Sequence, residues 1–195
     1  MRSIGDQNIY SSVQTVSRAN SAVIWLTGLS SAGKTTIGLA LLQEIRKMGL
    51  PVEFLDGDKL RKILSPELGF SRRERELHAR RVAYMSYLLS KNGVLTIVAL
   101  ISPFKESRNY ARKLIATFIE VWVKCSLQTC KMRDPKGLYR KAELGETNQM
   151  TGIQSPYEPP MNAELVLDTE RLHVDQCCSL VMEYLARIGL IHYNT

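Results

Sequence analysis

The chain has 195 residues, which at about 150 residues per domain indicates one domain with short additions. Hydrophobic residues make up 45% and charged residues 23%, which excludes a wholly disordered or collagen-like chain. The formal net charge of +7 favours anionic partners, but the basic residues are spread along the chain. We therefore expect small anionic substrates rather than nucleic acid or a membrane surface.

Residues 1–20 are rich in Ser, Asn and Gln, and we expect a flexible N-terminal arm that precedes a domain over 21–195. The arm lacks the apolar stretch of a signal peptide, and no apolar run is long enough for a transmembrane helix. The four cysteines lack the spacing of a structural zinc site and are expected to be reduced thiols of a cytoplasmic protein. They are Cys125, Cys130, Cys177 and Cys178.

Short apolar runs alternate with helical patterns, which predicts βαβ units and a mostly parallel sheet flanked by helices in an α/β fold. The strands are expected at 22–27, 52–55, 94–101, 118–123 and 165–167. The helices are expected at 35–48, 71–91, 105–116, 127–133 and 174–188, with a further helix through Leu60 and Ile63. Leu77, Tyr84, Met85 and Leu88 are expected to form the apolar stripe of the 71–91 helix.

The composition changes at residue 134. Four of the seven prolines, and three glycines, lie between residues 135 and 160. A connection this long inside a compact domain is typical of an active-site element. We expect a mobile lid over about 134–160, with Arg133, Lys136, Arg140 and Lys141 as cations that close over a phosphoryl group.

Residues 28–35 fit the phosphate-loop pattern G-x-x-x-x-G-K-[ST] between a predicted strand and a predicted helix. The glycines allow backbone N–H groups to surround phosphate oxygens, and the helix adds the positive end of its dipole. Lys34 is expected to reach the β- and γ-phosphates of ATP, and the Thr35 hydroxyl to bind Mg²⁺. The alternative is a chance glycine-rich turn. The residues expected to bind ATP are Gly28, Leu29, Ser30, Ser31, Ala32, Gly33, Lys34, Thr35, Thr36 and Arg133.

Polar residues follow two further strands, at the edge of the sheet where ligands bind. Asp56 and Asp58 could hold Mg²⁺ or accept a proton, or could cap the next helix, a task that Asp58 could perform alone. Ser102 is a candidate for binding phosphate or substrate or for forming a covalent adduct, and a simple strand-ending turn is the alternative.

The segment 61–81 is strongly basic, and arginine forks suit sulfate and phosphate. Arg75 and His78 are three residues apart and share a face of the predicted helix. For Arg72 and Arg73 we favour a solvated surface. His78 has no partner at metal-ligand spacing, so we interpret it as a hydrogen-bonding or surface residue.

Several separated motifs occur in an order that resembles the adenylylsulfate (APS) kinase family. They are GLSSAGKTT at 28–36, LDGDKLR at 55–61, LGFS at 68–71, ISP at 101–103, RDPKGLY at 133–139 and TGIQSPYE at 151–158. The resemblance extends from about Val23 to Ile188. It implies a three-layer fold of the P-loop NTPase type with a five-stranded sheet, and a homodimer.

The resemblance also implies a reaction, in which Mg²⁺ and ATP phosphorylate the 3′-hydroxyl of APS to give 3′-phosphoadenylylsulfate. Lys34, Asp56, Asp58 and Ser102 match catalytic positions, and Thr35 and Asp56 match metal ligands. No obligatory phosphoserine is expected, because phosphoryl transfer of this type mostly needs positioning and electrostatics. The residues expected to bind APS are Asp58, Arg61, Phe70, Arg75, His78, Ile101, Ser102, Lys136, Leu138 and Met150.

The sequence departs from the family pattern in the acceptor region. His78 replaces the usual Asn, which suggests that APS affinity changes between pH 6 and 8. Met150 replaces a Phe that stacks on the APS adenine, and Lys59 replaces an Asn with no evident consequence. Two alternatives therefore stay open, a kinase for another small hydroxylated substrate and a non-catalytic nucleotide-binding relative. The intact Lys34 and Thr35 argue against the second.

Overall fold

The computed structural model describes residues 21–147 and 149–192, so the predicted arm over 1–20 lies outside the described residues. The centre of the fold is a parallel sheet with the strand order β2-β3-β1-β4-β5. The strands are β1 Val23–Thr27, β2 Val52–Asp56, β3 Leu95–Ala99, β4 Phe118–Lys124 and β5 Leu165–Asp168.

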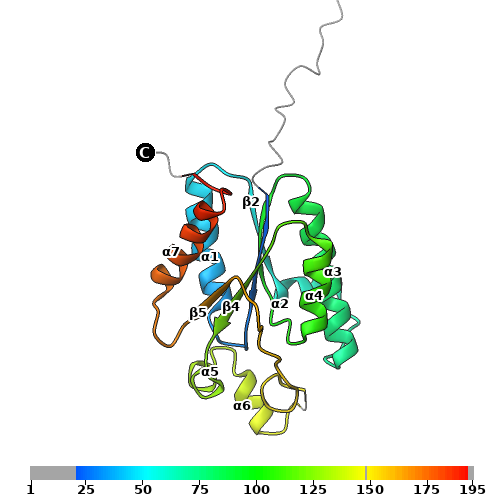
Figure 1. The fold of residues 1–195 in the computed structure, drawn as a ribbon. Coiled ribbons are helices and arrows are strands. Elements are labelled where there is room, and N and C mark those ends of the chain that lie inside the picture. Colours follow the sequence, from blue (N-terminus) through cyan, green and yellow to red (C-terminus); the bar gives the residue numbers. More distant parts are fainter. Residues whose placement is uncertain (1–20, 148, 193–195) are drawn as a thin grey trace, which may run out of the picture.

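Helices cover both faces of the sheet, as the alternating pattern predicts. In Figure 1, α1 and α7 lie on one face, α3 and α4 lie on the other, and α5 and α6 lie beyond the carboxyl ends of the strands. No helix among the described residues is both long and apolar enough to cross a membrane. The helices are α1 Lys34–Lys47, α2 Gly57–Leu64, α3 Arg72–Ser90, α4 Lys105–Leu114, α5 Leu127–Arg133, α6 Leu138–Glu143 and α7 Val174–Arg187.

Strand β1 explains why its sequence is a continuous apolar run. Ile24 and Leu26 belong to the core cluster under α1 and α7, whereas Val23 and Trp25 belong to the cluster under α3 and α4. A parallel strand that is buried on both faces cannot carry polar residues on alternate positions. The sheet therefore fixes β1 at its centre, and the loop that follows β1 emerges in the middle of the carboxyl edge.

The predicted apolar stripe of α3 is wrong for three of its four members. Leu77, Tyr84 and Leu88 are 39%, 54% and 37% exposed. The buried face instead carries small residues, such as Ala79 and Ala83. Small side chains allow the helix to approach the sheet closely. A prediction based on large apolar residues therefore chose the face of α3 that points away from the sheet.

Helix α6 lies inside the connection over about 134–160 that the sequence predicts as a mobile lid, where no helix was expected. It begins after Gly137, whose φ of +62° suits glycine. The Asp134 carboxylate accepts hydrogen bonds from the backbone N–H groups of Leu138, Tyr139 and Arg140. These bonds satisfy N–H groups that have no partner inside the helix. A short helix capped from four residues upstream has too little hydrophobic periodicity to be predicted.

A buried ion pair fixes α4 to the sheet and gives a stability prediction. Nε of Arg108 lies 2.6 Å from Oε1 of Glu120, and both side chains are less than a tenth exposed. Arg108→Leu leaves the Glu120 carboxylate buried, with Arg112 as its only remaining ion-pair partner among the described residues. We expect the free energy of unfolding, measured in urea, to fall by about 3 kcal/mol.

The matched control is Lys47→Ala, because Lys47 forms a solvent-exposed pair with Glu44. This substitution is expected to change the free energy of unfolding by less than about 0.5 kcal/mol. Equal effects of the two substitutions would show that the burial of the Arg108 pair has no energetic consequence.

Candidate active site

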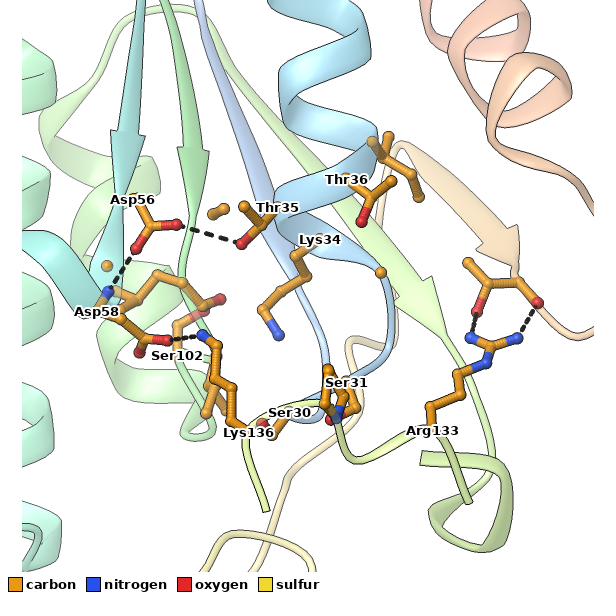
Figure 2. Close-up of a pocket in the computed structure, with 18 of the residues that line it drawn as sticks. Ser30, Ser31, Lys34, Thr35, Thr36, Asp56, Asp58, Ser102, Arg133 and Lys136 are labelled. Carbon is orange, nitrogen blue, oxygen red and sulfur yellow. Dashed lines mark hydrogen bonds and ion pairs between the residues drawn. The ribbon is translucent and has the colours of Figure 1, made fainter. Parts of the chain in front are cut away.

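A cavity of about 520 Å³ opens where β1, β2 and β3 end, and Figure 2 shows some of the residues that line it. Ligands of open α/β sheets bind at this edge. Residues from the phosphate loop, α2, α3, the β3 end and the predicted lid meet there. The predicted site residues that line the cavity are Ser30, Ser31, Gly33, Lys34, Thr35, Thr36, Asp56, Asp58, Arg61, Phe70, Arg75, His78, Ile101, Ser102, Arg133, Lys136 and Leu138.

The phosphate loop depends on glycine at its first position. Gly28 has a φ of +154°, and a Cβ atom there would lie 2.4 Å from the carbonyl oxygen of Val123. A side chain would therefore push the loop away from β4. Leu29 and Ala32 can offer a ligand only their backbone, because Ala32 is fully buried and Leu29 lines a different cleft beside Trp122.

Lys34 holds the phosphate loop from inside. Its ammonium group donates hydrogen bonds to the carbonyl oxygens of Gly28, at 2.9 Å, and Leu29, at 2.6 Å. Burial lowers the pKa of Lys34 to about 8, and the nearby negative charge of Asp58 opposes this shift. The positive charge therefore lies at the floor of the cavity, close to where the phosphates of a nucleotide would bind.

Asp56, rather than Asp58, caps α2, which corrects one alternative from the sequence. Oδ1 of Asp56 accepts from the backbone N–H groups of Asp58 and Lys59, both at 3.0 Å. Its Oδ2 accepts from the Thr35 hydroxyl at 3.2 Å, as Figure 2 shows. Asp56 is thus both the helix cap and the proposed metal ligand: Oδ1 caps α2, and Oδ2 faces Thr35.

Asp58 forms an ion pair with Lys136 across the cavity (Figure 2). Asp58 comes from α2, whereas Lys136 comes from the connection between α5 and α6. Hydrogen bonding to the Asp58 carboxylate raises the pKa of Lys136. The pair therefore joins the first residues of the predicted lid to the acceptor side of the cavity.

Two arginines and one aromatic ring form the far end of the cavity. The guanidinium carbons of Arg61 and Arg75 lie 4.4 and 5.2 Å from the centre of the Phe70 ring. Neither arginine forms an ion pair with a carboxylate among the described residues. Burial, together with the charge of Arg61, lowers the pKa of Arg75 to about 10. Such a cluster attracts a ligand that has both a planar ring and an anionic group.

The opposite end of the cavity contains residues that the sequence analysis missed. Arg133 donates to the side chain and carbonyl oxygens of Thr169, at 3.1 and 2.6 Å. Leu172 and His173 also line this end. They follow β5, so the rule that ligands bind at the carboxyl ends of strands could have identified them. Tyr139 of α6, also missed, supports the phosphate loop by donating to the Ser30 carbonyl oxygen at 3.1 Å.

Known proteins are similar to this chain in sequence and in fold. A model of the adenylylsulphate kinase family matches residues 20–168. The chain belongs to this family. A probable adenylyl-sulfate kinase of Pyrococcus abyssi is 49% identical over 86% of this chain and 97% of its own length. A probable adenylyl-sulfate kinase of Archaeoglobus fulgidus is 50% identical over 77% of this chain and 97% of its own length.

The family relationship extends to a solved structure. The APS kinase of Mycobacterium tuberculosis in complex with AMPPNP and APS is 39% identical to this chain. It superposes with a TM-score of 0.83 and covers 86% of this chain and 98% of its own. The P-loop NTPase type of α/β fold predicted from the motifs is confirmed.

His78 is a buried, hydrogen-bonded residue at the wall of the cavity, so its interpretation as a hydrogen-bonding residue is confirmed. Its side chain is 2% exposed, with Nδ1 2.9 Å from the Ser65 hydroxyl and Nε2 3.2 Å from the Gly57 carbonyl oxygen. Because a carbonyl can only accept, Nε2 carries the proton and Nδ1 accepts from Ser65. Burial, with the charge of Arg61, lowers the pKa of His78 to about 4. The expected titration of His78 between pH 6 and 8 is therefore wrong.

Met150 lies in the protein core and is not among the residues that line the cavity. It is 9% exposed and belongs to the cluster under α1 and α7. Its backbone is held by Gln154, whose side-chain oxygen accepts from the Met150 N–H at 2.9 Å. In this structure the Met150 side chain is therefore not placed to contact APS in the cavity, contrary to the prediction.

The buried neutral state of His78 makes stability depend on pH. In the unfolded chain the imidazole takes up a proton below about pH 6.5, whereas in the folded protein it does so only near pH 4. The unfolded state binds more protons in this window, so the free energy of unfolding falls as the pH falls from 6.5 to 4. The expected loss from this residue is about 3 kcal/mol.

Urea denaturation at pH 7 and pH 4.5 measures this effect in the wild type and in His78→Asn. The asparagine variant is expected to lose less stability between the two pH values. His173→Asn is the control, because His173 is exposed at the start of α7. An identical pH dependence in the wild type and His78→Asn would contradict the assignment.

Proposed function

We propose that this chain transfers the γ-phosphoryl group of ATP to the 3′-hydroxyl of adenosine 5′-phosphosulfate. The observation that carries the proposal is one cavity that joins a phosphate loop to the Arg61–Phe70–Arg75 cluster. The first end suits a nucleotide triphosphate, and the second suits a ligand with a purine ring and an anionic sulfate. Membership of the adenylylsulphate kinase family supports this pairing.

The phosphate end supplies electrostatic stabilisation. The Lys34 ammonium lies beneath the loop, and the loop N–H groups precede the positive end of the α1 dipole. Negative charge moves toward the β–γ bridging oxygen as the γ-phosphoryl group leaves ADP. The Lys34 ammonium, which two loop carbonyl oxygens hold beside the cavity, can stabilise that charge electrostatically.

We assign a Mg²⁺ ion to the Thr35 hydroxyl and the Asp56 carboxylate. Their oxygen atoms lie 3.2 Å apart and are hard ligands of the kind that Mg²⁺ prefers. Nucleotide phosphates and water would complete the shell, which agrees with the lack of any cluster of three metal-binding side chains among the described residues. When bound, the ion would neutralise charge on the phosphate oxygens.

Asp58 and Lys136, which line the cavity and pair with each other, would position the acceptor. The O3′–phosphorus bond forms as the bond to the ADP oxygen breaks, and the hydroxyl proton passes to a nearby carboxylate. We favour Asp56 for metal or base chemistry and Asp58 for holding the acceptor. Lys136 belongs to the predicted lid over 134–160 and brings its positive charge to the cavity. Closure of this lid would exclude water from the reacting groups. The expected homodimer stays a prediction.

Phosphoryl transfer by the purified protein tests the proposed function. ATP and Mg²⁺ are supplied with APS, adenosine 5′-monophosphate, gluconate or shikimate in parallel, and the products are identified by mass. We expect preferential conversion of APS to its 3′-phosphate. Transfer to another acceptor, or ATP binding without any transfer, would overturn the proposal.

Lys34→Ala is expected to lower turnover by about 100-fold or more, because a charge that stabilises the transition state is lost. Steady-state kinetics with saturating ATP measures the effect. Lys47→Ala, which removes an exposed lysine at the other end of α1, serves as the control and is expected to keep wild-type turnover. Wild-type turnover in Lys34→Ala would refute the role of the phosphate loop.

Asp56→Asn separates metal binding from helix capping. Asparagine caps helices about as well as aspartate, so the thermal midpoint is expected to stay within a few degrees of the wild type. The lost negative charge is expected to raise the Mg²⁺ concentration needed for half-maximal activity by about 10-fold. Asp56→Ala should show the same metal effect and an added loss of stability of about 1 kcal/mol. An unchanged Mg²⁺ requirement in both variants would remove Asp56 from the metal site.

A further inference from the structure

The loop Ile101–Pro103, which we call the acceptor loop, leaves β3 in a strained conformation. Ser102 has a φ of +38°, a backbone region that residues other than glycine rarely adopt. Ile101 and Ser102 line the cavity that also contains Phe70 and Arg75. A strained backbone persists only where its surroundings hold it. The contacts that hold the acceptor loop therefore determine the shape of the acceptor end.

A directional chain of hydroxyl groups lies under this loop. The Thr27 hydroxyl donates to the Ile101 carbonyl oxygen at 2.7 Å and lies 3.1 Å from the Tyr157 hydroxyl. Because the proton of Thr27 is committed to that carbonyl, Tyr157 must be the donor to Thr27. Burial raises the pKa of Tyr157 to about 12, so the phenol keeps its proton at neutral pH.

Ser102 belongs to the same chain of hydroxyl groups. Its Oγ accepts from the indole N–H of Trp25 at 2.9 Å and donates to Thr27 at 3.0 Å. The side chain is 2% exposed. A hydroxyl that is buried and committed to two neutral partners has no base to activate it as a nucleophile. The geometry gives Ser102 a structural role in the acceptor loop and does not support a covalent adduct.

Glu158 binds the other side of the acceptor loop. Its backbone N–H donates to the Pro103 carbonyl oxygen at 2.8 Å. Its carboxylate accepts a hydrogen bond from the backbone N–H of Lys105 at 2.8 Å. Glu158 therefore caps α4 from 53 residues away, because the N-cap residue Phe104 has no side chain that could do so. Arg108 adds a bridge, because it donates to the carbonyl oxygens of both Ser102 and Glu158, at 2.8 and 2.7 Å.

We propose that Tyr157 and Glu158, at the end of the predicted lid, are positioning residues that hold the acceptor loop in its substrate-binding shape. Neither residue lines the cavity, so both act through the loop and not by touching the substrate. Tyr157 acts through Thr27 on Ile101, and Glu158 acts on Pro103 and the start of α4. The inference rests on the proposed function, because it concerns the affinity for the acceptor.

Steady-state kinetics of Tyr157→Phe tests the inference. The phenylalanine keeps the ring and removes only the hydroxyl that supports Thr27. We expect the KM for APS to rise by about three-fold to ten-fold, as the loss of one buried hydrogen bond predicts, with the KM for ATP and kcat nearly unchanged. Tyr84→Phe is the matched control, because Tyr84 is 54% exposed on α3 and is expected to leave all three parameters unchanged.

Two further sets of variants separate positioning from general stabilisation. Glu158→Gln keeps an oxygen acceptor for the Lys105 N–H and is expected to retain the wild-type KM for APS, whereas Glu158→Ala should raise it. Thr27→Val should raise the KM for APS as Tyr157→Phe does, and the double variant should show less than the product of the two effects.

The outcomes distinguish this inference from the proposed function. A wild-type protein that fails to phosphorylate APS overturns the proposed function. If the wild type is active, an unchanged KM for APS in Tyr157→Phe, or an equal rise in the KM for both substrates, overturns the positioning role alone. Multiplicative effects in the double variant would also contradict the route through Thr27. Thermal unfolding of every variant checks that the protein is folded at the assay temperature.

Discussion

The Lys34 ammonium bound to the carbonyl oxygens of its own loop is the interaction on which the site depends. It closes the turn between β1 and α1, and the turn can form only because Gly28 accepts a positive φ against the backbone of β4. Because β3 lies beside β1 and β2 lies beside β3, the ends of these strands bring Asp56 and Ser102 into one cavity, on the same side of the phosphate loop.

The sequence predicted the parts of this structure that depend on strong local patterns. The five strands and the phosphate loop follow from apolar runs and from glycines that are required at definite positions. The stripe of α3 could not be predicted, because a helix packed closely on a sheet buries alanines and leaves Tyr84 exposed. Helix α6 was missed because its stability comes from the Asp134 cap and not from periodicity.

In the candidate site, too, the sequence predicted which residues take part but not the environment of each residue. The motifs identified which residues enter the cavity, and most of the predicted ones line it. They could not show how each residue is held. The pKa of His78 depends on burial beside Arg61, and the orientation of Ser102 depends on Trp25 and Thr27, which come from a distant part of the sequence. Such tertiary partners leave no local signal.

The two arginines beside Phe70 have a thermodynamic consequence for the protein as a whole. Folding brings the like charges of Arg61 and Arg75 together, and the charge of Arg61 helps to lower the pKa of Arg75. Glu74 and Asp58 offset part of this effect at Arg61, but the folded state still contains a repulsion at Arg75 that the unfolded chain lacks. Any anion that binds between them relieves this repulsion and stabilises the folded form by mass action. The apparent stability of this enzyme therefore depends on the anions in solution, and its melting temperature rises with the fraction of molecules that bind an anion beside Phe70.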